Sequence, residues 1–233
     1  MKIFEGLSRF TGDQIQVLVS GIVRPSANRK TGDMWQTYVV LSGDSLSPID
    51  AVKMGFDMAV CGLCKLRPIF ERARKALGRA VGAACYVVVA NDVNAIWKSH
   101  RNTPVVPIDT VASRGVPVRL GSYGEPTAVK DIDVWHALIK RAGGRHTGYT
   151  QQWSRADTQP YRLILMASVH SEGQQATAAA KGWRTFRTIR QGEPLLAGEI
   201  LCPYPRVQCA RCLLCDGKHG QTDKRKNIAE YWH

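Results

Sequence analysis

The sequence contains no apolar run of the roughly 18 to 20 residues that a membrane-spanning helix requires. Its first segment, MKIFEGLSRFTGDQ, also lacks the apolar core and cleavage site of a signal peptide. We therefore expect a cytoplasmic protein without membrane contacts. The chain has no phosphate-binding loop, no dinucleotide-binding glycine fingerprint and no helix-turn-helix pattern. It also lacks the His-x-His pair that marks a relaxase-type nuclease.

Acidic residues are few compared with basic ones. The chain has 19 Asp and Glu against 32 Lys and Arg, which gives a formal net charge of +13. A surplus of this size favours a polyanionic partner, either a nucleic acid or a phosphorylated ligand. Part of the charge is clustered, and the residues that we select as nucleic-acid contacts are Arg72, Lys75, Arg184 and Arg187. The alternative is an ordinary solvated surface. These features do not determine the oligomeric state.

The seven cysteines fall into two groups, with none left over. The first group consists of Cys61, Cys64 and Cys85, and the second consists of Cys202, Cys209, Cys212 and Cys215. Thiols stay reduced in the cytoplasm, so this spacing indicates metal or iron–sulfur sites rather than a disulfide framework. The two groups form two separate sites or converge on one centre in space.

The second group has the pattern C-x6-C-x2-C-x2-C over residues 202–215. Zinc in proteins usually takes its thiolates as separated pairs, whereas three closely spaced thiolates are typical of ferredoxin-like clusters. We therefore favour a four-iron, four-sulfur cluster for this group, with zinc as the alternative. The first group offers only three thiols, which leaves one coordination position open for a substrate or cofactor. Its alternative is a structural zinc completed by a distant His or Asp.

The order of predicted elements indicates an α/β fold. Val- and Ile-rich segments at residues 14–24 and 36–42, with a polar segment at 25–33 between them, predict an N-terminal β-hairpin. Between residues 116 and 190, about four apolar strands alternate with helices, one of them over 127–142. This order favours a partial or complete parallel β/α barrel of the TIM type. An open doubly wound sheet is the alternative.

The same pattern divides the chain into three ranges. We expect a β-rich segment at residues 1–57, a barrel-like core at 58–196 and a Cys-rich metal-binding tail at 197–233. Within the core, residues 86–90 are expected to be strand-like or extended, and residues 162–168 are expected to form a buried strand.

Functional side chains of such a fold lie at the carboxyl ends of its strands. The segment Ser122-Tyr123-Gly124-Glu125 follows one predicted strand, and His170 follows another. His170 could therefore lie at the same open face as Glu125 and act as a general base or ligand. The alternative for His170 is an ordinary surface position.

Two resemblances sharpen these expectations. The Cys61-x2-Cys64 pair, Cys85-Tyr86 and the Gly124-Glu125-Pro126 turn resemble the layout of radical S-adenosylmethionine enzymes, although the usual motif of that family is C-x3-C-x2-C. The resemblance implies that the first cysteine group binds a cluster with one open iron and that S-adenosylmethionine is a cofactor. It further implies that Glu125 accepts a hydrogen bond from the cofactor's ammonium group, that Gly124 permits close backbone approach, and that Ser122 and Tyr123 belong to the cofactor-binding turn.

The chain also resembles uncharacterised Cys-rich proteins of bacteriophages and mobile elements. This likeness rests on Arg119-Leu-Gly-Ser-Tyr-Gly-Glu-Pro126, Thr147-Gly-Tyr-Thr-Gln-Gln-Trp153, Gly182-Trp-Arg-Thr-Phe-Arg187 and the cysteine-rich tail. It implies an origin in a phage or plasmid and a location in the host cytoplasm. The leading hypothesis is an iron–sulfur enzyme with Glu125 and His170 as catalytic residues, acting on a nucleic acid or nucleotide. The alternative is a non-enzymatic, metal-stapled DNA- or RNA-binding protein of phage or plasmid replication or regulation, and a redox sensor is a third hypothesis.

Overall fold

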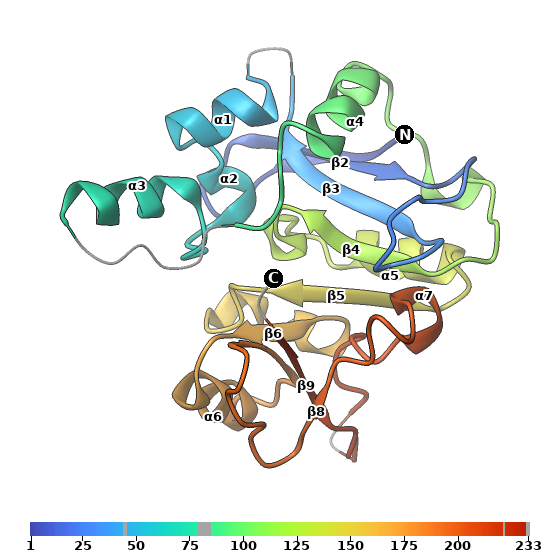
Figure 1. The fold of residues 1–233 in the computed structure, drawn as a ribbon. Coiled ribbons are helices and arrows are strands. Elements are labelled where there is room, and N and C mark those ends of the chain that lie inside the picture. Colours follow the sequence, from blue (N-terminus) through green and yellow to red (C-terminus); the bar gives the residue numbers. More distant parts are fainter. Residues whose placement is uncertain (44–45, 79–84, 221, 232–233) are drawn as a thin grey trace.

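The computed structural model describes residues 1–43, 46–78, 85–220 and 222–231. Its strands are β1 (Lys2–Leu7), β2 (Gln14–Ser20), β3 (Trp35–Leu41), β4 (Val118–Tyr123), β5 (His146–Thr150), β6 (Met166–Val169), β7 (Thr185–Ile189), β8 (Glu199–Leu201) and β9 (Asn227–Tyr231) (Figure 1). Its α-helices are α1 (Pro48–Met54), α2 (Met58–Cys61), α3 (Pro68–Ala76), α4 (Asp92–His100), α5 (Asp133–Arg141), α6 (Glu172–Ala180) and α7 (Cys209–Cys212). Short 3-10 helices are η1 (Ile108–Thr110), η2 (Pro126–Ala128) and η3 (Ala156–Leu163).

The strands form one nine-stranded sheet in the order β1-β2-β3-β4-β5-β6-β7-β9-β8. The pairs β1–β2 and β2–β3 are antiparallel, and every pair from β3 onward is parallel. Within the described ranges the sheet is open, with β1 and β8 at its edges. The predicted α/β class and the N-terminal β-hairpin are therefore confirmed, and the sheet is mostly parallel.

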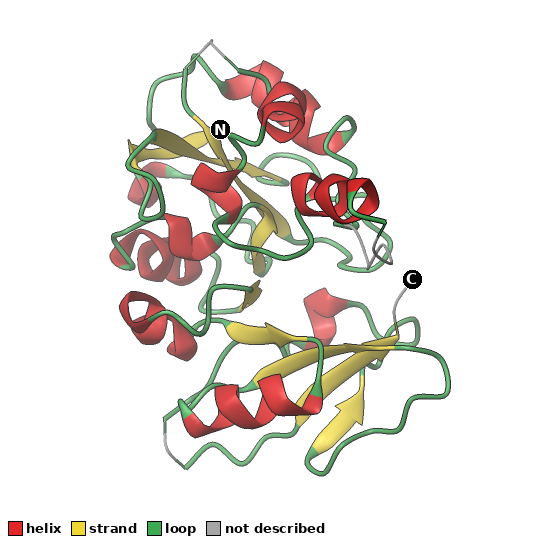
Figure 2. Cartoon of the chain, turned by 90° about the vertical axis from the view of Figure 1, so that its left-hand side faces the viewer, coloured by secondary structure: helices red, strands yellow, loops and turns green. Residues whose placement is uncertain are grey.

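Burial explains why these segments form strands in the middle of the molecule. Residues 15–19 of β2 and residues 35–40 of β3 are buried, which matches apolar strands covered on both faces. Helix α4 packs against β2, and α6 lies along β6 and β7 in the lower part of Figure 2. The amphipathic α5 directs Trp135, Leu138 and Ile139 into the core.

Several predicted elements differ from the observed ones. Residues 86–90 form no strand, because their backbone is irregular and leads directly into α4. The helix expected over 127–142 is split into η2 and α5, because Val129 is buried in an extended conformation and residues 130–132 form an irregular connection. The strand expected at 162–168 starts only at Met166, since η3 occupies the residues before it.

The sheet also joins the three ranges into which the sequence was divided. Strand β3 of the first range pairs with β4 of the second, and β7 of the second pairs with β9 of the tail. The tail thus contributes two strands, β8 and β9, to the same sheet. None of the helices in the described parts of the chain has both the length and the apolar character that a membrane span requires.

Arg184 and Arg187 are buried, with 3% and 2% of their surface exposed, which corrects the prediction that they contact a nucleic acid. Arg184 donates to the backbone oxygens of Leu214, Gly217 and Lys226, and so fastens the tail to β7. Arg187 forms a bidentate ion pair with Glu199, with both N···O distances at 2.8 Å. Both guanidinium groups therefore form hydrogen bonds within the protein.

Replacing Arg187 with Met should destabilise the fold strongly, because the side chain of Glu199 is 0% exposed and would be left buried without its partner. We expect the free energy of unfolding in urea to fall by about 3–5 kcal/mol. The double variant Arg187→Met/Glu199→Leu should recover most of this loss. The exposed Arg190→Met serves as control and should change stability by less than about 0.5 kcal/mol. An Arg187→Met variant as stable as the control would contradict this role.

Candidate metal and cofactor site at the strand ends

The carboxyl ends of β3, β4 and β5 meet at one edge of the sheet, because these strands are parallel neighbours. The first cysteine pair follows β3 on α2 and the loop after it, and Glu125 follows β4. The backbone N–H of Glu125 donates to the carbonyl oxygen of Val60 at 2.6 Å, which fixes the Glu125 turn against α2. Figure 1 shows α2 and α3 beyond the arrowheads of β3 and β4.

A buried ion pair holds the cysteine loop in shape. The Arg67 guanidinium donates two hydrogen bonds to the Asp57 carboxylate, at 2.6 and 3.0 Å. It also donates to the backbone oxygens of Gly55 and Gly62. These contacts close the loop that carries Cys61 and Cys64. The backbone N–H of Cys85 donates to the Leu66 oxygen at 2.8 Å, which brings the third cysteine to the same loop.

The three thiols of the first group lie near one another and near Glu125. All three are free and half-buried. Burial, followed by the Asp57 carboxylate and the thiols of Cys64 and Cys85, raises the pKa of Cys61 well above its ordinary value. Burial and then Glu125 raise the pKa of Cys64 to about 12. The thiols are therefore protonated at neutral pH, and a bound cation would favour their thiolate forms.

Glu125 is 7% exposed, and its carboxylate accepts three hydrogen bonds. Thr150 Oγ1 donates at 2.6 Å, the backbone N–H of Gln151 donates at 2.9 Å, and Thr127 Oγ1 donates at 3.5 Å. Within the described chain, no Lys, Arg or His side chain forms an ion pair with Glu125. Burial raises its pKa to about 7, against the lowering effect of these hydrogen bonds.

His170 is linked to Glu125 through Gln151. The Gln151 side chain lies 3.1–3.2 Å from His170 Nε2, and the backbone of the same residue donates to Glu125. Thr188 Oγ1 lies 2.7 Å from His170 Nδ1. Burial and then the charge of Lys65 lower the pKa of His170, so the imidazole is neutral near pH 7. The structure therefore brings the two predicted catalytic side chains into one polar network.

The other residues of the predicted cofactor turn have partners inside the protein. A Cβ at Gly124, where φ is +71°, would lie 2.5 Å from the Val39 oxygen, so this glycine is required for packing against β3. Ser122 Oγ donates to Gln36 Oε1 at 2.6 Å. Tyr123 is buried, and its pKa is raised well above the ordinary value by burial and then by the nearby Cys61.

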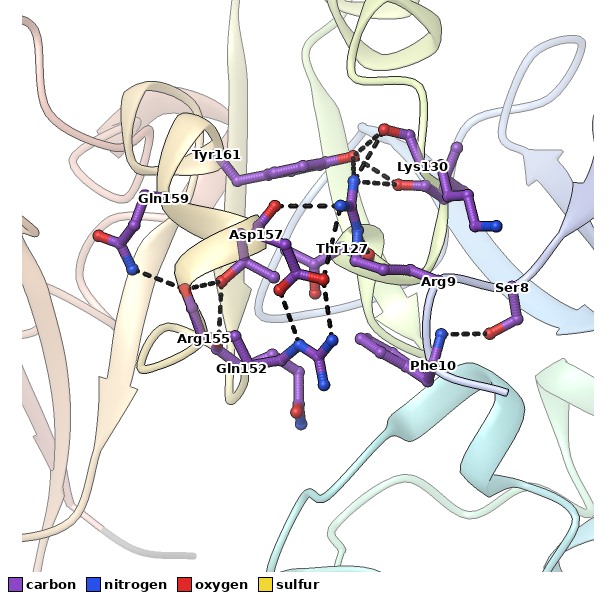
Figure 3. Close-up of polar contacts among 12 residues, drawn as sticks. Ser8, Arg9, Phe10, Thr127, Lys130, Gln152, Arg155, Asp157, Gln159 and Tyr161 are labelled. Atoms are coloured by element: carbon purple, nitrogen blue, oxygen red, sulfur yellow. Dashed lines mark hydrogen bonds and ion pairs between the residues drawn. The ribbon is translucent and has the colours of Figure 1, made fainter. Parts of the chain in front are cut away.

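Arg9, from the turn between β1 and β2, fixes the segment that follows Glu125 (Figure 3). Its Nε donates to the Thr127 oxygen at 2.9 Å, and its Nη2 donates to the Lys130 oxygen at 2.8 Å. Its Nη1 donates to the Asp157 oxygen at 3.0 Å, which connects the segment after β4 to the segment after β5. Arg9 thereby anchors the segment that contains Thr127, one partner of Glu125, to η3.

The second cysteine group lies at the opposite ends of the strands. The backbone N–H groups of Cys209 and Ala210 donate to Lys30 and Thr31, just before β3, and Figure 1 shows α7 at the other end of β5 from α2. Cys202, Cys209, Cys212 and Cys215 line one small cavity of about 20 Å³. Burial raises the pKa of Cys215 above its ordinary value, against a hydrogen bond with Tyr149. The two cysteine groups are therefore separate.

The donor chemistry of both groups suits soft metals such as zinc and iron. The cysteines are nevertheless not arranged as metal ligands. In the described part of the chain, no set of three or more His, Cys, Asp or Glu side chains is placed so that it could hold a metal ion. The sulfur atoms of each group would have to move closer together to coordinate a metal. No protein-family model, no curated protein and no solved structure matches this chain.

The sequence indicated the cysteines, Glu125 and His170, but not the residues that position them. Thr150 and Gln151 hold the carboxylate, and the Arg67–Asp57 pair shapes the cysteine loop. The polar run Thr150-Gln151-Gln152, which begins at the last residue of β5, was a signal for Thr150 and Gln151. Arg72 and Lys75 lie exposed on α3, and their contact with a nucleic acid stays a prediction.

The raised pKa of Glu125 predicts how stability depends on pH. Between about pH 4.5 and pH 7 the folded protein binds more protons at this carboxyl than the unfolded chain does, so the free energy of unfolding falls as the pH rises. Glu125→Gln does not titrate and should gain up to about 3 kcal/mol relative to the wild type between pH 4 and pH 8. Urea unfolding over this range measures the difference. The exposed Glu172→Gln should follow the wild type, and a constant gap between Glu125→Gln and the wild type would refute the buried, titrating carboxyl.

Proposed function

We propose that this chain is an iron–sulfur protein of the radical S-adenosylmethionine type that acts on a nucleic acid or nucleotide. The observation that carries the proposal is the buried Glu125 carboxylate beside the thiols of Cys61 and Cys64. A buried carboxylate is costly unless a cation compensates it. The ammonium group of S-adenosylmethionine would supply such a cation.

The sheet supports the same proposal. The strands β3, β4, β5, β6, β7 and β9 are parallel neighbours in chain order, as in a β/α barrel that is only partly complete. We propose this partial barrel as the architecture. Both the cysteine loop after β3 and the Glu125 turn after β4 then lie at the edge where such folds carry their chemistry.

Each residue of the site has a defined part in this proposal. Cys61, Cys64 and Cys85 would hold an iron–sulfur cluster, which supplies an electron for reductive cleavage of S-adenosylmethionine when both are bound. Glu125 binds the ammonium group, while Thr150 and the Gln151 backbone orient the carboxylate. The neutral imidazole of His170 can accept a proton at Nε2, the atom that faces Gln151.

Arg119, which lies near Tyr86, Tyr149 and Cys209, is a candidate contact for an anionic substrate. Its Nη2 donates to the exposed Tyr86 hydroxyl at 3.0 Å, and its Nε is buried without a hydrogen-bond partner in the described residues. Among those residues, no carboxylate forms an ion pair with Arg119. A guanidinium group in this state can bind a phosphate or carboxylate.

The second candidate function is a metal-stapled nucleic-acid-binding protein without chemistry of its own. It is favoured by the small cavity between the four cysteines of the tail, which has room for about one ion rather than for a four-iron cluster. The backbone contacts of Arg184 fasten this part of the tail firmly to the sheet. In this candidate, both cysteine groups hold structural zinc.

Metal analysis of anaerobically purified protein separates the two candidates. The proposed enzyme should contain about four irons and as many sulfides per chain, or about eight if the tail also holds a cluster. Cys61→Ser should remove the iron of the first site, whereas Cys212→Ser should leave it in place. A protein with stoichiometric zinc and no iron would end the radical proposal and favour the binding protein.

Glu125→Gln should bind S-adenosylmethionine at least about tenfold more weakly than the wild type, because the ammonium loses its charged acceptor. Calorimetric titration of iron-loaded protein measures this directly. The iron content of the variant should equal that of the wild type, which shows that its fold is retained. Glu172→Gln is the matched control, since it makes the same substitution at an exposed position. Equal affinities for Glu125→Gln and the wild type would exclude the proposed role.

A further inference from the structure

The cysteine-rich tail forms a second concave surface, which we call the arginine pocket. It has a volume of about 460 Å³ and lies at the surface beside α7. Its lining consists of Arg29, Tyr204, Pro205, Arg206, Val207, Gln208 and Arg211. The pocket therefore gathers three guanidinium groups, one phenol ring and one amide, with no carboxylate in its lining.

The three arginines are available to a ligand. Arg29, Arg206 and Arg211 are all exposed. In the ranges of the chain that the structure describes, none of the three forms an ion pair with an acidic side chain. This contrasts with Arg184 and Arg187, whose guanidinium groups are buried and occupied by the protein itself.

The pocket is also fixed in shape, although its walls come from two distant parts of the chain. Arg29 belongs to the loop between β2 and β3, and the remaining lining belongs to the tail. Gln208 Nε2 donates to the Arg29 oxygen at 3.0 Å, and the Cys209 N–H donates to the Lys30 oxygen at 3.1 Å. Because these contacts join the two walls, the backbone positions that carry the arginines lie close together before any ligand binds.

We infer that the arginine pocket binds the phosphodiester backbone of a single-stranded nucleic acid. One guanidinium group can bind a phosphate through two parallel N–H···O hydrogen bonds. Three guanidinium groups in one pocket that lacks a carboxylate can bind successive phosphates of a nucleic-acid strand. Tyr204 provides an aromatic ring of the kind on which bases stack in single-strand sites. The concave form suits a flexible strand better than a rigid duplex.

This inference deepens the proposed function and rests on it only in taking a polyanion as the partner. Arg211 of the pocket belongs to α7, and Figure 1 shows α7 at the other end of β5 from α2, which carries Cys61. Binding at the pocket therefore does not require iron or S-adenosylmethionine. A nucleic acid held here would be attached to the protein independently of any chemistry at the other end.

The test measures binding of a fluorescent single-stranded oligonucleotide of about 20 nucleotides, by anisotropy at several salt concentrations. The triple variant Arg29→Gln/Arg206→Gln/Arg211→Gln should bind at least about thirtyfold more weakly at ~0.1 M salt. For this variant, the slope of log affinity against log salt concentration should be smaller in magnitude by about 2 than for the wild type, because roughly three phosphate contacts are lost. Its urea unfolding midpoint should match that of the wild type, since all three side chains are exposed.

The control variant Lys98→Gln/Lys140→Gln/Arg190→Gln removes the same charge from exposed positions elsewhere. It should change affinity by no more than about threefold. Equal losses in the two triple variants would show that affinity follows net charge alone and would overturn the inference, as would failure of the wild type to bind the oligonucleotide. Iron content and S-adenosylmethionine binding of the pocket variant distinguish the two proposals. Both should stay at wild-type values, and if neither exists in the wild type while pocket-dependent binding persists, the enzyme proposal fails and the pocket stands.

Discussion

The parallel pairing of β3, β4 and β5 is the constraint on which the candidate site depends. Parallel neighbours end at the same edge, so the segments that leave these three strands are forced together although they are far apart in sequence. The bond from the Glu125 N–H to the Val60 oxygen is a direct result of this meeting. An antiparallel partner for β4 would have placed Glu125 and the cysteine loop at opposite ends of the sheet.

Buried charges show how unusual Glu125 is within this molecule. Arg67 is paired with Asp57, and Arg187 is paired with Glu199, so each charge is compensated at short distance. Such pairs add little net stability, but they define where the neighbouring loops lie. Glu125 has hydrogen bonds in place of a cation, and its raised pKa is the physical consequence of that environment. This absence of an ion-pair partner within the described residues is the reason for our proposal of a positively charged ligand at Glu125.

The two ends of the sheet have different chemical characters. At the carboxyl ends of the strands, half-buried thiols, Glu125 and His170 form a polar interior. At the opposite end, the tail gathers four cysteines near a surface pocket whose arginines form no ion pair with any described residue. The residues between Cys202 and Cys215 supply both the thiols and most of the arginine pocket, so the conformation of the cysteine segment also decides where Arg206 and Arg211 lie. Chemistry and attachment could thus be divided between two sites of one small protein.

The α/β class, the N-terminal hairpin, the grouping of the cysteines and the positions of Glu125 and His170 after strands could all be predicted from the amino-acid sequence. These features depend on local periodicity and spacing, which are properties of neighbouring residues. The folded structure was needed to show that Arg187 is buried against Glu199, that β9 pairs with β7, and that Gln151 connects Glu125 to His170. It also shows that Arg29 joins the tail arginines in one pocket. These contacts connect residues far apart in the chain, and no local pattern encodes them, because they depend on how the strands are ordered in the sheet.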